Sequence, residues 1–337
     1  MESCNVKIEQ GFLTLEETCT KIALGEQLVV AADEMFLSEL PSGNWIGGTI
    51  PYFMTKEGGT QSSQKAFVHT IRGGKSSKLS MYDHSNIDKI ASDTPQSGFT
   101  IVILPAGSEV HSSYSEHAPN YEDMFDSPII GWVSGVHLSS VDSSTPKTVY
   151  GSGKHLSKTN AVAMHVEIPQ EQVATISIVN SFSQGTGPEI RFMETGFNIH
   201  KCIVDGKECL FSEYLKEFNI DTKLPMVADY SGTGVNVSIK NVDHDKNVVK
   251  LYAPVFKDIM YKFPDTQDDY LYAYKKSISK AEGLDRSQFS VSCVLNYLYS
   301  GLEGKKVSEL TGPITFGEVA YQLLNQTSVY LTIEPSM

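Results

Sequence analysis

The chain is poor in arginine and lacks any long apolar run. Arginine occupies three of the 337 positions, and the formal net charge is −13. Nucleic acids and anionic membrane surfaces both require clustered basic residues, so neither is an expected partner. No segment approaches the roughly 18 consecutive apolar residues of a membrane-spanning helix. Glu2, Lys7 and Glu9 interrupt the apolar core that a secretory signal would need. We therefore expect a cytoplasmic protein.

Metal-binding cysteine pairs and complete catalytic motifs are also missing. The five cysteines are an odd number and include no C-x-x-C, and Cys202 and Cys209 are too far apart for a standard zinc knuckle. Free thiols in a reducing compartment fit this pattern best. No P-loop, G-x-G-x-x-G fingerprint or G-x-S-x-G nucleophile elbow occurs. An enzyme is therefore not the favoured interpretation.

A weak internal repeat is the main positive signal. Three segments each combine an apolar strand, an Ile-containing Gly turn and an alternating strand. Fully apolar short runs are typical of buried central strands, and alternating runs of half-buried ones. Chance similarity among strand-turn-strand units is the alternative. The segments are residues 27–32, 45–48 and 66–71; residues 99–104, 128–132 and 161–166; and residues 289–294, 313–318 and 329–333.

Segments with helical spacing of apolar residues lie between these predicted strands in the sequence. Apolar residues recur at helical spacing in three segments, and a polar run with Asp-His-Asp-Lys-Asn at its tip predicts a hairpin over residues 239–248. Exposed loops are expected over residues 58–64 and 73–80, and a connection over residues 221–231. Together these features predict an α/β (mixed α+β) fold with layered sheets flanked by helices in two pseudo-repeated halves. The helical segments are residues 34–40, 209–218 and 268–280.

Several of these segments resemble the FIST sensory-domain family. The C-terminal pattern consists of residues 289–294, the turn Gly312-Pro313-Ile314-Thr315-Phe316-Gly317-Glu318 and residues 324–329. Weaker N-terminal matches are Ile46-Gly47-Gly48-Thr49, Pro128-Ile129-Ile130-Gly131 and residues 197–208. The resemblance covers residues 27–334. It implies a FIST N-terminal-like domain over residues 1–225 and a C-terminal-like domain over residues 226–337.

The resemblance implies a non-catalytic protein that binds a small ligand in intracellular signal transduction. FIST domains are thought to bind ligands such as amino acids, and one bacterial branch binds haem and responds to nitric oxide. No output domain is evident in the sequence. A separate signalling protein or a homo-oligomer would then carry the signal. No cofactor is expected, with a haem-binding gas sensor as the alternative.

The Gly-aromatic turns predict where such a ligand would bind. Both tryptophans adjoin an Ile-Gly sequence, which suggests a shared apolar pocket with few polar groups. The alternative is that these aromatic residues only fill the core. Glu318 would need a partner if buried, either a ligand or a nearby turn. Cys293 is expected to be an inert core thiol. The predicted pocket residues are Trp45, Gly47, Thr49, Tyr52, Trp132, Phe316 and Glu318.

The histidines support two further alternatives. A haem iron would need an axial ligand such as His69 or His165, although hydrogen-bonded sheet histidines are the favoured interpretation of both positions. Any haem would be non-covalent because no C-x-x-C-H occurs. His111 and His117 would be the centre of a metal-dependent or hydrolytic enzyme, with a solvated loop as the alternative for this segment.

Overall fold

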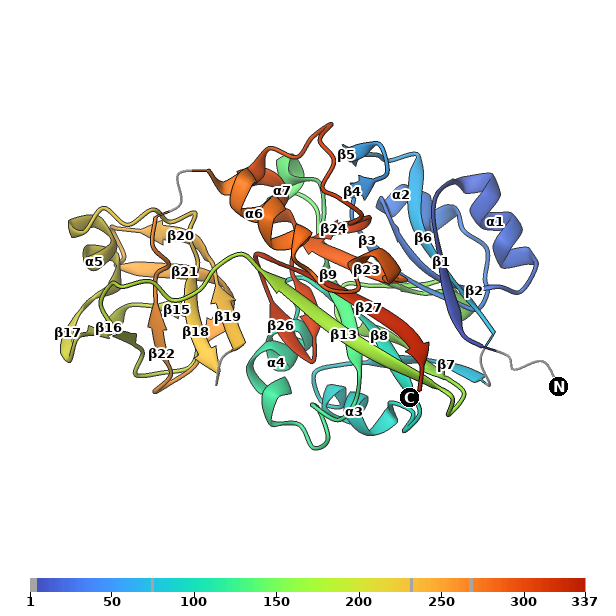
Figure 1. The fold of residues 1–337 in the computed structure, drawn as a ribbon, viewed down its shortest axis with the longest axis horizontal. Helices are drawn as coiled ribbons and strands as arrows, with labels where there is room; N and C mark the ends of the chain where they lie inside the picture. Colours follow the sequence, from blue (N-terminus) through green and yellow to red (C-terminus); the bar gives the residue numbers. More distant parts are fainter. Residues whose placement is uncertain (1–4, 74–75, 231–232, 267–268, 337) are drawn as a thin grey trace.

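The structure is a computed structural model that describes residues 5–73, 76–230, 233–266 and 269–336. Within these ranges the strands form four six-stranded sheets and one three-stranded sheet, with helices around them (Figure 1). The predicted mixed α/β class with layered sheets is confirmed. Four cysteines, Cys19, Cys202, Cys209 and Cys293, are free thiols, whereas Cys4 lies outside the described residues.

Three units with the same order of elements make up the main body. The first unit, residues 7–72, contains β1 (Lys7–Thr14), α1 (Leu15–Ala23), β2 (Gln27–Ala32), α2 (Glu34–Glu39), β3 (Trp45–Thr49), β4 (Tyr52–Thr55), β5 (Gly58–Gln61) and β6 (Lys65–Arg72). The second unit, residues 76–167, contains β7 (Ser76–Tyr82), α3 (Ile90–Asp93), β8 (Gly98–Pro105), α4 (Glu109–His117), β9 (Ile129–Ser134), β10 (Thr148–Tyr150), β11 (His155–Ser157) and β12 (Ala161–Glu167). The third unit contains β13 (Gln172–Asn180), α6 (Tyr270–Ser279), β23 (Phe289–Cys293), α7 (Val294–Ser300), β24 (Gly312–Thr315), β25 (Glu318–Ala320), β26 (Gln322–Leu324) and β27 (Thr327–Pro335).

Strand pairing shows that the units repeat one architecture. A parallel central pair occurs in each: β2 with β3, β8 with β9, and β23 with β24. The return strands β6, β12 and β27 run antiparallel to β2, β8 and β23. The edge strands β1, β7 and β13 pair with the return strands. The predicted sequence repeat is therefore confirmed, with three members rather than two halves.

Exchanged hairpins join the three units into a closed ring. Strand β10 pairs with β3 of the first unit, β25 pairs with β9 of the second, and β4 pairs with β24 of the third. Each unit therefore completes the sheet of a neighbour. Strands from both sides of the predicted boundary at residues 225 and 226 pair directly, as β13 does with β27.

Two of the three predicted Gly turns are wrong because their residues lie in strands, whereas Phe316 and Gly317 form a bend between β24 and β25. Gly47 and Gly48 lie in β3, and Gly131 lies in β9. A Cβ atom on Gly131 would lie 1.8 Å from the carbonyl oxygen of Val102. A Cβ on Gly48 would lie 2.6 Å from Cγ2 of Ile103. These glycines therefore allow close packing inside sheets, which is the second structural use of glycine besides turns.

Some predictions of individual helices, strands and loops are confirmed and others are wrong. The helices α2 and α6 are confirmed, as is the hairpin formed by β20 (Ile239–Asp243) and β21 (Val248–Val255). Three predicted loops are wrong. Residues 58–61 form β5, residues 76–82 form β7, and residues 109–117 form α4, while residues 74–75 lie outside the described ranges. The predicted connection contains β18 (Met226–Tyr230). Polar strands such as β7 depend on distant partners, here β12, which local composition does not reveal.

An inserted module, residues 190–262, interrupts the third unit between β13 and α6. Its sheets follow the orders β17-β16-β14-β22-β18-β19 and β15-β21-β20 around a separate core that includes Phe192, Phe211 and Tyr261. The module lies at the left of Figure 1, beside the main body. Its remaining elements are β14 (Ile190–Arg191), β15 (Gly196–Ile199), β16 (Lys201–Val204), β17 (Lys207–Leu210), α5 (Phe211–Glu217), which confirms the third predicted helix, β19 (Thr233–Val237) and β22 (Met260–Lys262).

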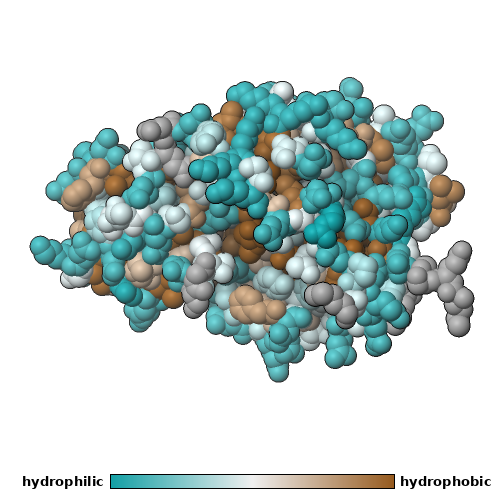
Figure 2. Space-filling view, viewed as in Figure 1, coloured by the Kyte–Doolittle hydropathy of each residue, from teal (hydrophilic) through white to brown (hydrophobic). Residues whose placement is uncertain are grey.

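The visible surface is largely hydrophilic. Figure 2 shows one face covered mainly by polar side chains with scattered apolar ones. Among the described residues, no helix has the length and apolar character needed to cross a membrane.

Candidate functional site

A cavity of about 550 Å³ lies where the second unit, the third unit and the inserted module meet. It opens beyond the carboxyl ends of two parallel strand pairs. Ala106 and Gly107 follow β8, Val136 follows β9, Val294 follows β23, and Phe316 follows β24. Ligands of α/β proteins commonly bind at such strand ends, and the volume is in the range of small-molecule sites.

The cavity wall is mostly apolar. Leu138 comes from the loop after β9, Leu295 from α7, and Phe197 and Tyr252 from the module. Val141 and Leu298, which also line the cavity, are 47% and 45% exposed and lie toward solvent. An apolar wall can bind the apolar part of a small molecule. Because the cavity is partly open to solvent, the polar groups of that molecule can stay in contact with water.

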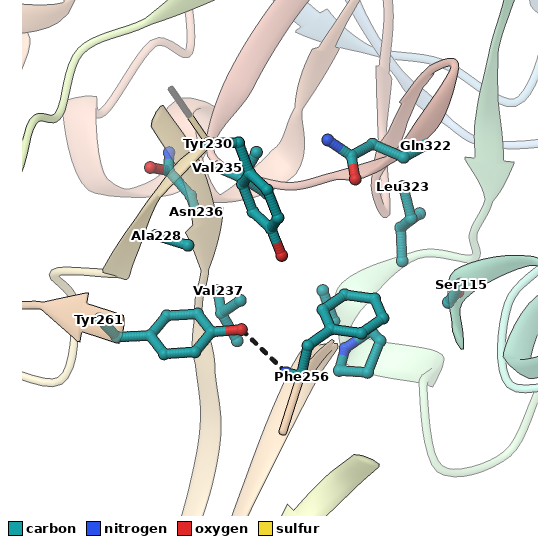
Figure 3. A pocket seen from close by; sticks show the side chains of 12 residues that line it. Ser115, Ala228, Tyr230, Val235, Asn236, Val237, Phe256, Tyr261, Gln322 and Leu323 are labelled. Carbon is teal, nitrogen blue, oxygen red and sulfur yellow. Dashed lines mark hydrogen bonds between the residues drawn. The ribbon is translucent and has the colours of Figure 1, made fainter. Parts of the chain in front are cut away.

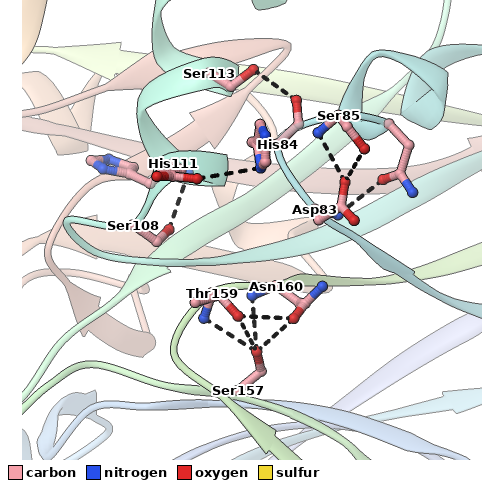
Figure 4. A network of polar contacts seen from close by, with 11 residues as sticks. Asp83, His84, Ser85, Ser108, His111, Ser113, Ser157, Thr159 and Asn160 are labelled. Atoms are coloured by element: carbon pink, nitrogen blue, oxygen red, sulfur yellow. Dashed lines mark hydrogen bonds and ion pairs between the residues drawn. The ribbon is translucent and has the colours of Figure 1, made fainter.

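His111 is the buried titratable residue of the cavity. It stands in the first turn of α4, where the side chain of Ser108 caps its backbone N–H (Figure 4). His111 Nδ1 accepts the backbone N–H of Gly107 at 3.4 Å, so in the neutral ring the proton lies on Nε2. Burial, together with the positive charge of Lys240, lowers the pKa of His111 to about 4. The ring is therefore neutral at pH 7 and can donate one N–H bond.

Two lysines of the module stand at the same cavity. Lys240 is on β20 and Lys250 on β21, at the irregular register between Ile239 and Asn241. The Lys240 ammonium lies 5.9 Å from the ring centre of Tyr252. Within the part of the chain that the structure describes, neither lysine forms an ion pair with a carboxylate. Both ammonium groups are therefore free to bind an anion.

Buried polar contacts hold the module against the main body. The side-chain amides of Asn180 and Asn236 bond to each other reciprocally at 2.9 Å. Asn325 Oδ1 accepts the Ser238 backbone N–H at 3.0 Å, directly before the strand that carries Lys240. The amide nitrogen of Asn325, a cavity-lining residue, is buried and has no partner among the described residues. The reciprocal Asn180–Asn236 bonds and the Ser238–Asn325 bond fix the module against the main body, so the cavity is preformed.

A second hollow, between the module and the main body, is much smaller. Figure 3 shows Tyr230, Tyr261 and Phe256 of the module facing Ser115 and Gln322 of the main body. Its volume is about 10 Å³, room for about one water molecule. The Tyr261 hydroxyl already accepts the Phe256 backbone N–H at 2.8 Å. This hollow is too small for an organic ligand.

Among the seven residues predicted as a pocket, only Phe316 lines the large cavity. Trp45 and Trp132 belong to different core clusters on opposite faces of β3, because Cβ positions built on Gly47 and Gly48 would contact one tryptophan each. The two tryptophans therefore do not share a pocket.

Thr49 and Tyr52, two further predicted pocket residues, form hydrogen bonds with backbone groups and do not line the cavity. Thr49 donates its hydroxyl to the Lys147 carbonyl at 3.2 Å. The Tyr52 hydroxyl accepts the backbone N–H of Leu138 at 3.0 Å. Tyr52 thereby positions the loop that covers the cavity without lining it.

Glu318 is fully buried beside the core thiol of Cys293. Its Oε2 accepts the Thr327 hydroxyl at 2.7 Å and the Thr327 backbone N–H at 3.3 Å, while Oε1 has no partner among the described residues. Burial raises the pKa of Glu318 to about 8. A carboxyl group in this state is mostly protonated at pH 7 and needs no counterion.

The two histidines considered as haem ligands are in different states. His165 contacts the Tyr82 hydroxyl at 2.9 Å and the Thr100 hydroxyl at 2.7 Å, as expected of a sheet histidine. Neither ring nitrogen of His69 has a partner in the described residues, and burial lowers its pKa to about 3. Its ring centre lies 4.4 Å from that of Phe289. A hydrogen-bonded role for His69 is therefore wrong.

The segment with His111 and His117 is helix α4 rather than a loop. His111 is buried, whereas His117 is exposed at the last turn. Across the described ranges, no three or more His, Cys, Asp or Glu side chains are placed to hold a metal ion together. The nearby polar contacts, such as Ser113 with the His84 carbonyl, connect α4 to the segment after β7 (Figure 4).

Sequence reasoning missed the two lysines and the cavity itself. Lys240 and Lys250 lie in the hairpin region that the sequence predicted, but lysines on an exposed hairpin look alike whether or not a cavity lies beside them. His111 was identified for a different chemistry.

Comparison with known proteins gives a family without a function. No curated protein matches the chain. A family model described as DUF6976, a family of unknown function, matches residues 13–334, which cover the whole module and, apart from most of β1 and the last residue of β27, the three units. The chain therefore belongs to DUF6976.

Proposed function

We propose that this protein is a non-catalytic sensor that binds a small molecule in the cavity between the second unit, the third unit and the inserted module. The observation that carries the proposal is the preformed, mostly apolar cavity of about 550 Å³ at the ends of two parallel strand pairs. The sensory role comes from the resemblance to FIST domains, which the match to DUF6976 neither includes nor tests.

The position of the cavity suggests how binding would be transmitted. A ligand there would touch α4, α7 and the β20–β21 hairpin together. Because a ligand stabilises the arrangement that binds it, occupancy would favour one placement of the module on the main body. A separate signalling protein or a second copy of the chain would then recognise that placement.

Native mass spectrometry of freshly purified protein tests the proposal. Ser112 lines the cavity from α4, and the neighbouring Ser113 does not. We expect a small molecule to co-purify with the wild type and with Ser113→Trp, and to be absent from Ser112→Trp, in which the indole fills the cavity. Equal retention by Ser112→Trp would place the ligand elsewhere and refute this site.

The gas-sensor alternative has a separate test. A haem iron needs an imidazole nitrogen with a free lone pair. In the cavity, His111 Nδ1 accepts the Gly107 N–H and Nε2 carries the proton, and neither His69 nor His165 lines the cavity. We therefore expect no Soret band above background when the protein is supplied with haem.

A further inference from the structure

The charges around the cavity are few and unequal in sign. Lys240, Lys250 and Asp142 are the charged residues among those that line it, which leaves one net positive charge. The chain as a whole carries −13. A locally positive opening on an acidic protein attracts a small anion.

His111 extends this positive region into the cavity. Lys240 and His111 line the same cavity, from the module and from α4 respectively. The neutral ring offers its Nε2–H, since Nδ1 already accepts the Gly107 N–H. A hydrogen-bond donor and two ammonium groups at one cavity are groups suited to bind an oxyanion.

We propose that the ligand is a small organic monocarboxylate with an apolar body, whose carboxylate binds Lys240, Lys250 and the Nε2–H of His111. The apolar body would lie against Phe316, Leu295 and Tyr252, the apolar and aromatic part of the wall. This inference rests on the proposed function and adds the chemical class of the ligand.

Charge and donor geometry favour a carboxylate over a phosphate. One net positive charge balances a monoanion, whereas a phosphate monoester carries close to two negative charges at pH 7. Arg72, Arg191 and Arg286 do not line the cavity, so the paired guanidinium donors that often bind phosphate are missing from its lining.

A matched set of ligands tests the head group. We would measure binding of 4-phenylbutyrate, 4-phenylbutylamine and 4-phenylbutan-1-ol by isothermal titration calorimetry. The three share one apolar body and differ in head-group charge. We expect the carboxylate to bind at least about tenfold more tightly than the amine and the alcohol, and its affinity to fall as salt increases.

Variants test the residues. The double substitution Lys240→Gln, Lys250→Gln should lower the affinity for 4-phenylbutyrate at least about tenfold and leave the alcohol unchanged. Lys246→Gln, at the tip of the same hairpin, is the control because Lys246 pairs with Asp243 at 3.6 Å and does not line the cavity. Circular dichroism would confirm that all variants are folded.

The outcomes separate the two proposals. Equal binding of all three ligands, tighter binding of the amine, or full affinity in the double lysine variant would overturn the carboxylate proposal and leave the cavity as a binding site. Failure of all three ligands to bind also overturns the carboxylate proposal. If, in addition, no molecule co-purifies with the wild type, the proposed function fails as well.

Discussion

His69 and His111 are both buried histidines with lowered pKa values, but they lie in regions of opposite character. His69 contacts the rings of Phe67 and Phe289, which belong to the same hydrophobic core as Trp132. His111 lies at a cavity that the lysines of the inserted module also reach. The core around His69 and Trp132 contains the aromatic and polar residues of a typical binding site. The described side chains there are closely packed and leave no space for a ligand. The comparison teaches that aromatic and polar residues form a site only where the tertiary structure leaves space beside them.

Trp132→Ala should have the largest effect on the packed core. The side chain is fully buried, so its removal should lower the free energy of unfolding by about 3–5 kcal/mol. Urea denaturation measures this change. A loss below about 1 kcal/mol would show that the region around Trp132 is not densely packed.

Glu318 should make the stability of the core depend on pH. Its pKa is about 8 in the folded protein against 4.5 for an ordinary carboxyl group. The folded state therefore holds a proton that the unfolded state loses, and this contribution to stability is complete below about pH 4.5 and decreases as pH rises to 8. Relative to Glu318→Gln, the wild type should lose on the order of 3 kcal/mol between pH 5 and pH 8.

Urea denaturation of both proteins at the two pH values measures this difference. Comparison with Glu318→Gln cancels the opposite contribution of the buried histidines, whose lowered pKa values stabilise the fold as pH rises toward 6.5. Parallel pH profiles for the two proteins would contradict a buried, protonated Glu318.

Asn236→Ala should affect the junction between the two regions. It removes the fully buried Asn236 amide and leaves the half-buried amide of Asn180 with fewer partners, at a cost of about 1–3 kcal/mol. Since the same contacts hold the module that carries the lysines, ligand affinity should fall as well. Denaturation and calorimetry on one preparation would test whether the two losses occur together.

His117→Gln should have the smallest effect. His117 is exposed, so the free energy of unfolding should change by less than about 0.5 kcal/mol and ligand binding should remain intact. Loss of binding or of a hydrolytic activity in this variant would revive the enzyme hypothesis based on His111 and His117.

Strand identity was more predictable than the site. The apolar runs that became β2, β8 and β23 were evident because a central strand buried on both faces must be apolar throughout. Polar strands such as β7 were not evident, because pairing with a distant strand can stabilise a sequence of low local preference. Phe316 was the one predicted pocket residue at the cavity.

The sequence by itself determined the mixed α/β class, the repeated order of strands and the shortage of basic clusters, since each follows from local composition and periodicity. Only the tertiary structure decided that hairpins are exchanged among three units and that Lys240 lines the same cavity as His111, which lies more than a hundred positions earlier in the chain. Such contacts depend on how whole sheets pack, and no local pattern encodes them. The tertiary structure likewise separated the glycines and tryptophans that form the core from the residues that border an open cavity.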